Sequence, residues 1–267
     1  MVIAAGLVLG QAAAVNTVSQ APAPAAESLE IQAARHHYFS ARYMAAADAA
    51  APLTKSGPEA LAAFELRTSA LHFELKRLLD DAPNKSKALK QCASCQGIID
   101  AFMKDVTAGK ALAKGILKTQ PRNEAATFYL GKLDSNYVWL QLATLGKRTG
   151  WGEYWSARHS MDDVLKMNPR HIRARVARAW IDYIVDTRVP FGTQWILGGG
   201  DRKRALKWIT DAVASAKDAY TYDRVEAEFA LWEMLVREKR PADARVIASR
   251  LILEFPDNQD LKKFLSK

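Results

Sequence analysis

The sequence predicts an all-α protein built as a row of stacked helical hairpins, and three observations carry this prediction. Apolar residues recur at helical spacing from Glu27 onward. No segment sustains the alternation of apolar and polar residues, with β-branched enrichment, that is typical of strands. A pattern of small residues followed by a proline returns several times in the second half of the chain.

Helical periodicity and the punctuation by proline and glycine define the expected elements. The predicted helices cover residues 28–51, 58–80, 87–108, 110–119 and 124–145, and helical hairpins continue to the end.

The segment before these helices has a different composition. Met1–Gly10 is apolar and an Ala/Pro mixture follows it up to Ala26, which predicts a secretory signal peptide and linker over residues 1–26, although a charged start is absent. The alternative is an apolar first helix that packs on the body.

The small-residue pattern has a fixed register. Its first copy is Gly109, Ala113, Ile116 and Pro121, at offsets 0, 4, 7 and 12. Offsets 0, 4 and 7 lie on one face of a helix, where small side chains let a neighbouring helix approach closely, and the proline ends that helix. The other copies are Ala157, Met161, Val164 and Pro169; Ala244, Ala248, Leu251 and Pro256; and Ala205, Ile209 and Ala212, with Lys217 in place of the proline.

This pattern resembles the second helix of the tetratricopeptide (TPR) repeat. The first-helix half matches best after Pro121, where Leu130-Gly131 lies at the expected distance. The resemblance implies a right-handed TPR-like α-solenoid over residues 27–267: divergent hairpins at 27–108, recognisable repeats at 109–256 and a capping helix at 257–267. Copies 48, 48 and 39 residues apart exceed the family's unit of about 34 residues, so long inserted turns are expected, over 146–155 and 186–201. A non-repeating helical bundle remains the alternative.

Composition excludes several classes of protein. The chain has 267 residues, 49% of them hydrophobic, and a formal charge of +9, which is typical of a folded domain and not of a disordered, collagenous or coiled-coil chain. No apolar run is long enough to span a membrane.

The basic charge is concentrated in one window. The segment from Lys147 to Lys207 holds 13 basic and 6 acidic residues and so carries most of the net charge. This charge indicates either an acidic partner or a solvated face balanced by nearby carboxylates.

Few residues are candidates for catalysis, redox chemistry or metal binding. Cys92 and Cys95 are the only cysteines; we expect a local disulfide or a pair of thiols, with thiol redox as the lesser alternative because the βαβ context of redox motifs is missing. Gln96 stands where a haem attachment motif needs histidine. The five histidines form no metal-ligand pattern, so no metal and no cofactor is predicted, and no nucleotide-binding or hydrolase motif occurs.

The expected binding surface combines aromatic and basic residues. All seven tryptophans lie between Trp139 and Trp232, and the two insertions contain several of them. Large aromatics in such turns either fill the gap between hairpins or form a recognition surface. The residues predicted to bind a partner are Arg173, Arg178, Trp151, Trp155 and Trp195.

The sequence thus favours an exported, periplasmic or secreted scaffold that binds an acidic protein or peptide on its concave face, without catalysis. One alternative is an accessory component of a transporter or cell-envelope complex that recognises an anionic small ligand or polymer. A thiol-redox protein using Cys92 and Cys95 is the third. Export argues against nucleic acid as the partner despite the basic charge.

Overall fold

The computed structural model describes residues 27–79, 82, 84–147, 149–188, 194–216 and 221–267. The predicted signal peptide and linker, residues 1–26, lie outside these residues. Most of the described residues are helical, and none of them lies in a strand. None of its helices is both long and apolar enough to cross a lipid bilayer.

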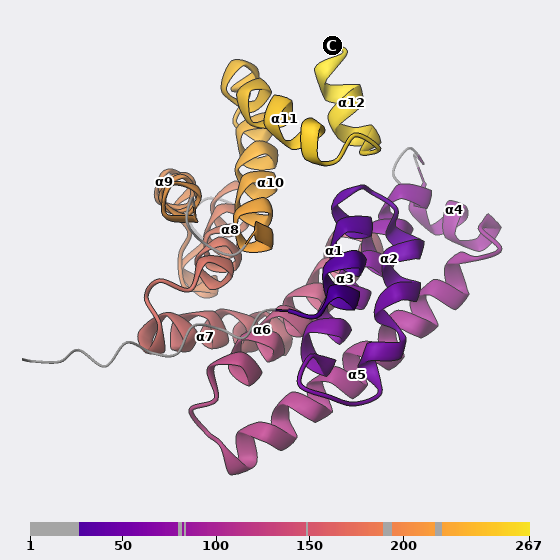
Figure 1. The fold of residues 1–267 in the computed structure, drawn as a ribbon, viewed down its shortest axis with the longest axis vertical. Coiled ribbons are helices and arrows are strands. Elements are labelled where there is room, and N and C mark those ends of the chain that lie inside the picture. Colours follow the sequence, from indigo (N-terminus) through magenta and orange to yellow (C-terminus); the bar gives the residue numbers. More distant parts are fainter. Residues whose placement is uncertain (1–26, 80–81, 83, 148, 189–193, 217–220) are drawn as a thin grey trace, which may run out of the picture.

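Twelve α-helices are present in the described residues, and Figure 1 shows their arrangement. Their bounds are α1 Leu29–Phe39, α2 Tyr43–Ala50, α3 Ala60–Leu79, α4 Lys85–Gln91, α5 Cys95–Thr119, α6 Glu124–Val138, α7 Trp151–Met167, α8 Ile172–Arg188, α9 Arg202–Ser215, α10 Thr221–Arg237, α11 Pro241–Glu254 and α12 Gln259–Leu265. Two short 3₁₀ segments, η1 (Pro52–Thr54) and η3 (Gln194–Leu197), and one π-helical segment, η2 (Trp139–Thr144), accompany them.

The recurring small residues lie where the repeat interpretation requires them. They fall on α5, α7, α9 and α11, and in α7, α9 and α11 every one of them is at most 2% exposed. These helices pair most extensively with α3, α6, α8 and α10 respectively, which gives four successive hairpins. The prediction of an all-α array of helical hairpins is confirmed.

Glycines permit the closest helix contacts in this array. A Cβ on Gly109 of α5 would come within 2.8 Å of Leu133 on α6 and 3.0 Å of Phe64 on α3. A Cβ on Gly131 of α6 would come within 2.7 Å of Ser160 on α7. Gly131, which matches a small position of the TPR pattern, therefore permits the close helix packing that the pattern predicts.

Three predicted helix boundaries are wrong. Residues 28–51 form two helices, because Ala41 adopts a left-handed conformation (φ 58°) and ends α1. The predicted break at Gly109 is absent, and α5 runs through it; the break lies instead at Cys92–Ser94, between α4 and α5. Residues 151–155, expected in an inserted turn, form the first turns of α7.

The first helix joins the two ends of the array. Phe39, at the end of α1, stacks on Phe229 of α10 with ring centroids 5.2 Å apart. Asn258, the N-cap residue of α12, donates from its side-chain Nδ2 to the Phe39 carbonyl at 2.8 Å. Figure 1 shows α12 above α1 and α2, with its C-terminal end pointing away from them. The array thus curves back on itself, and α1 lies on its inner side.

Candidate partner-binding surface

The start of α7 carries the first group of predicted site residues. Gly150 precedes α7 with a left-handed backbone (φ 94°), which lets the chain turn sharply into Trp151. Positions 151, 154, 155 and 158 share one face of the helix because they are three and four residues apart. A bond of 3.3 Å from Lys110 of α5 to Glu153 fixes this first turn against the neighbouring hairpin.

The second insertion lies between α8 and α9. Its described part contains η3, followed by Gly198 and Gly199 with positive φ of 76° and 73°. Asp201 then caps α9, because its side chain accepts a bond of 2.9 Å from the Arg204 backbone N–H. The cap occupies the position at which an anion would bind the helix.

The two insertions meet. The Tyr154 hydroxyl donates to the Leu197 carbonyl at 2.7 Å, and the Arg158 guanidinium donates to the Gly198 carbonyl at 2.7 Å. These bonds hold η3 against the first turns of α7. Tyr154 therefore has the packing role, because it links the two hairpins, whereas Trp151 and Trp195 keep exposed side chains.

The exposed side chains here are large and apolar. Trp195 is 76% exposed, Ile196 55% and Trp151 50%. Trp155 is half-buried and stacks on His159 with ring centroids 5.5 Å apart. We name Trp151, Trp155, Trp195 and Ile196 the tryptophan junction. A group of large exposed apolar side chains on neighbouring segments is typical of protein-binding surfaces, whereas single ones are normal.

Arg178 does not reach this surface. It is buried and pairs with Asp162 of α7 at 2.6 Å and with Asp182 of its own helix. The buried Asp182 carboxylate also accepts Arg158 of α7 at 3.4 Å and Arg204 of α9 at 3.1 Å. Burial alone would lower the pKa of Arg178, but bonds to Asp182 and Asp162 outweigh it and raise the pKa. One carboxylate thus joins three helices.

Arg173 is also buried, on the inner side of the array. Its guanidinium lies 2.9 Å from Glu65 of α3 and 2.6 Å from Glu226 of α10, and 4.9 Å from the centre of the Phe128 ring. Lys132 of α6 lies 3.0 Å from Glu226 and 3.4 Å from Glu65. Burial alone would raise the pKa of Glu226, but Arg173 and Lys132 lower it well below its usual value. The four charges compensate one another within the chain.

The predicted site therefore separates into two groups. The structure brings Trp151, Trp155 and Trp195 to neighbouring elements, whereas the guanidinium groups of Arg173 and Arg178 are enclosed by carboxylates. Four exposed basic residues on or beside the insertions take part in no ion pair found in the described chain: Lys147, Arg188, Arg202 and Lys203. The sequence included these four in its basic window but did not distinguish them from the buried ones.

Cys92 and Cys95 form a disulfide with Cα atoms 5.4 Å apart. Of the histidines, His72 is buried and bonds Thr144 at 2.9 Å. Among the residues whose placement is described, no three His, Cys, Asp or Glu side chains gather as a set of metal ligands.

An open depression of about 470 Å³ lies beside α7 and α9. The residues that line it are His159, Asp162, Asp163, Leu165, Lys166 and Trp208.

Comparison with known proteins gives one solved structure and no sequence relative. No family model matches the chain, and no curated protein matches it in sequence. The crystal structure of a thermophilic TPR protein from Thermus thermophilus is similar to this chain with a TM-score of 0.48 and 16% identity. That similarity covers 89% of this chain and 96% of the other.

Proposed function

We propose that this chain is a helical-repeat scaffold that binds an acidic segment of another protein at the tryptophan junction. The observation that carries the proposal is the exposure of Trp195, Ile196 and Trp151 on segments that Tyr154 and Arg158 hold in place. Tryptophan contributes large contact area at little entropic cost, which is why it dominates many interfaces. The surface is therefore both apolar and ordered before a partner arrives.

Charge supports an acidic partner. Arg188, Arg202 and Lys203 flank η3 in sequence, are exposed and lack a carboxylate partner in the ion pairs of the described residues. Opposite charge on a partner would speed association and fix its orientation. Nucleic acid is not proposed, because the export proposed below would separate the protein from nucleic acid.

The inner side of the array is less suited to a partner. Helix α1 lies there, with Ile31 and Ala34 fully buried against α3. Arg173 is compensated by Glu65 and Glu226. A partner at this position would have to displace a core helix, so the proposal assigns binding to the insertions and not to the concave face.

We propose in addition that the protein acts outside the cytoplasm. Two features support this: the apolar, alanine-rich residues 1–26, and the disulfide between Cys92 and Cys95, since disulfides persist mainly in oxidising compartments. A site for an anionic small ligand is not proposed. The depression beside α7 and α9 is open, and Asp162 and Asp163 line it.

The test compares capture of binding partners by the mature chain and by the Trp195→Ala/Trp151→Ala variant, from the cells that make the protein. A partner identified with the unaltered chain should bind the variant at least about 30-fold more weakly, as expected for loss of interface hot spots. Its binding should also weaken as salt is raised. The variant should keep its helical circular dichroism and stay folded at the temperature of the binding assay, because Trp195 is 76% exposed and Trp151 50% exposed.

Leu253→Ala is the matched control. Leu253 is 82% exposed on α11, away from both insertions, so this variant should bind the partner unchanged. Equal loss of binding in the control, or full binding by the double tryptophan variant, would contradict the proposal. A captured partner without an acidic segment would contradict the charge argument alone.

A further inference from the structure

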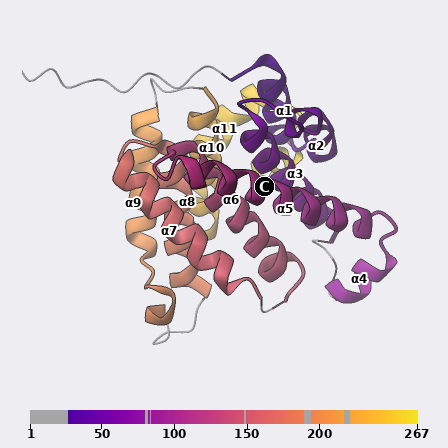
Figure 2. The same cartoon turned by 90° about the horizontal axis from the view of Figure 1, so that it is seen from below.

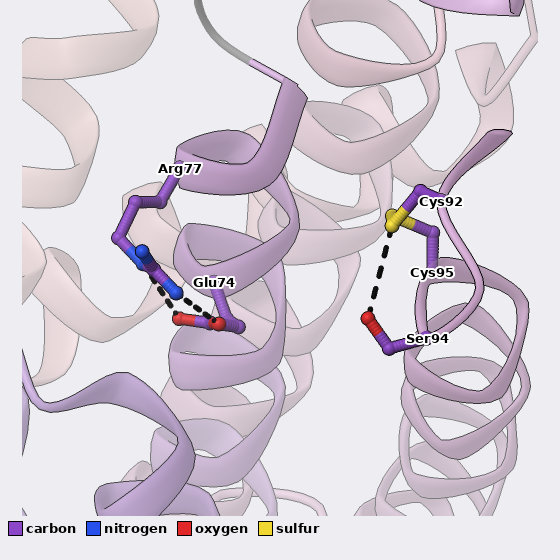
Figure 3. The surroundings of a disulfide bond; sticks show 5 residues. All are labelled: Glu74, Arg77, Cys92, Ser94 and Cys95. Atoms are coloured by element: carbon purple, nitrogen blue, oxygen red, sulfur yellow. Dashed lines mark hydrogen bonds and ion pairs between the residues drawn. A yellow bond between two sulfur atoms is a disulfide. The ribbon is translucent and has the colours of Figure 1, made fainter. Parts of the chain in front are cut away.

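The disulfide occupies an unusual position at the edge of the molecule. It connects Cys92, the residue that caps the end of α4, with Cys95, the first residue of α5. Figure 2 shows α4 at the periphery, on the side opposite α9, and Figure 3 shows the bond itself. The crosslink joins neighbouring parts of one segment and does not tie distant elements together.

Such a crosslink adds little to the fold. The entropic stabilisation by a disulfide grows with the length of the loop it closes, and here the cysteines are only three residues apart. Cys95 is fully buried in an apolar cluster with Leu71, Leu75 and Phe102, so packing already anchors the start of α5. The chemistry of the bond is therefore a better reason for its presence than its contribution to stability.

The two sulfurs lie in different surroundings. Cys95 has no exposed surface, whereas Cys92 is only half-buried, and its sulfur lies 3.7 Å from the hydroxyl of the exposed Ser94. An incoming thiolate can approach Cys92 and not Cys95. The bond therefore has one sulfur for attack and one sulfur to leave, which is the asymmetry that thiol–disulfide exchange uses.

The segment that carries the bond is basic in sequence. Lys85, Lys87 and Lys90 precede Cys92, and the nearest acidic residues along the chain are Asp81 and Asp100. Figure 3 shows the carboxylate of Glu74, on α3, turned to Arg77, which bonds both of its oxygens at 2.6 and 3.0 Å. Burial among apolar residues disfavours negative charge on the leaving sulfur of Cys95, and the positive end of the 25-residue helix α5, at which Cys95 lies, acts against this effect.

We propose that Cys92–Cys95 is a reversible thiol–disulfide exchange site that accepts two electrons from a dithiol in another protein. One partner thiolate attacks Cys92 Sγ; a mixed disulfide forms, the Cys92–Cys95 bond breaks, and its electron pair leaves on Cys95 Sγ. The second partner thiolate then attacks the partner sulfur of the mixed disulfide and releases Cys92 as a thiolate. The partner becomes a disulfide, and the two cysteine sulfurs take up the two protons lost by the partner.

This proposal rests on the disulfide and goes beyond the scaffold function at the tryptophan junction. Its test uses the oxidised full chain, without denaturant, and a reduced peptide that contains two cysteines as the probe. One equivalent of chain should convert one equivalent of peptide to its disulfide. A reaction stopped by alkylation should yield, by mass spectrometry, peptide attached to Cys92 and an alkyl group on Cys95.

Single serine variants test the assigned roles. Cys95→Ser leaves Cys92 as the free thiol and should react with a small aromatic disulfide about 100-fold faster than Cys92→Ser, whose remaining thiol is buried. Circular dichroism verifies that both variants keep their helices. The double variant Cys92→Ser/Cys95→Ser, still able to capture a partner at the tryptophan junction, should leave the peptide reduced.

Three results would overturn the proposal. The first is a disulfide that stays closed with excess peptide dithiol and opens only in denaturant. The second is equal reactivity of the two single variants, and the third is peptide trapped on Cys95. None of these results affects the proposed binding at the tryptophan junction, because that test measures capture of a partner by variants that retain both cysteines.

Discussion

The carboxylate of Asp182 shows how a single buried charge can hold several helices together. It is almost fully buried, and arginines from α7, α8 and α9 surround it: Arg158, Arg178 and Arg204. A buried ion pair often adds little net stability, yet removing one partner leaves the other uncompensated. Asp182 therefore matters because of the positive charge that would remain without it.

We expect Asp182→Asn to lower the free energy of unfolding by about 3–5 kcal/mol, because two buried guanidinium groups lose their shared carboxylate. Urea unfolding at neutral pH measures this. The control is Asp211→Asn, which removes an exposed partner of Lys207 and should cost less than about 0.5 kcal/mol. Similar losses for the two variants would show that the arginines do not depend on Asp182.

His72 gives the fold a dependence on pH. Burial lowers its pKa to about 4, and Lys76 adds to the effect. A histidine in the unfolded chain titrates near 6.5, so the unfolded state binds more protons between these two values. The stability contributed by neutral His72 is complete above about pH 6.5 and is lost as pH falls toward 4.

From pH 7 to pH 5 we expect the free energy of unfolding to fall by about 2 kcal/mol through His72 alone. His72→Gln should flatten this part of the profile, because glutamine can still bond Thr144 and does not titrate in this range. Urea unfolding of both proteins at half-unit steps of pH provides the measurement. Parallel profiles would refute a role for His72 and assign the slope to other groups.

The burial of individual charged side chains was the feature that the sequence indicated least well. Arg173 and Arg178 belong to a basic run that predicts an exposed surface, and the partners of Arg173 are 53 and 108 residues away in the sequence. Nothing local distinguishes an arginine paired with such distant carboxylates from one that faces water. The tryptophans were not placed by the sequence either, because it left open whether large aromatics in the insertions fill the gap between hairpins or lie at the surface, and Trp151 and Trp155 belong to α7 rather than to a turn.

At the scale of elements, the buried face of the repeats' second helices could be predicted from their small residues, whereas the starts of α5 and α7 could not. A small side chain at offset 0 of each copy indicates a closely packed neighbouring helix, and the pattern that reveals it lies within one helix of the sequence. The four residues are Gly109, Ala157, Ala205 and Ala244. The break between α1 and α2 could not be predicted, because it depends on a positive φ at Ala41, a residue that rarely adopts one. The π-helical extension of α6 carries no local signal either.

Gly109 provides a test of this close packing. We expect Gly109→Ala to destabilise the protein by about 1–3 kcal/mol, because the added methyl would lie 2.8 Å from Leu133 and 3.0 Å from Phe64. Gly115→Ala is the matched control on the same helix. A Cβ there meets no atom within 4 Å, so the better helix propensity of alanine should stabilise by about 1 kcal/mol. Opposite signs in thermal unfolding would establish the contact, and stabilisation by both variants would refute it.

At the scale of the whole molecule, α1 changes how the array should unfold. In an open solenoid each hairpin contacts only its neighbours, so the ends can fray independently. Here the ring of Phe39 stacks on Phe229 and lies 5.7 Å from that of Phe255, and Asn258 bonds its carbonyl. These contacts connect the first helix to the last hairpin, so the termini of the array support each other.

We therefore expect a single cooperative unfolding transition for the unaltered chain. Every tryptophan lies between Trp139 and Trp232, so tryptophan fluorescence reports on the second half, whereas far-ultraviolet circular dichroism reports on all helices. The two signals should coincide in urea.

In Phe39→Ala the loss of a core aromatic should cost about 3–5 kcal/mol, and the fluorescence transition should shift to lower urea than the circular dichroism transition. Leu29→Ala, on an exposed position of the same helix, should leave both signals together. If the unaltered chain already gave separate transitions, the ends would be independent and α1 would not couple them.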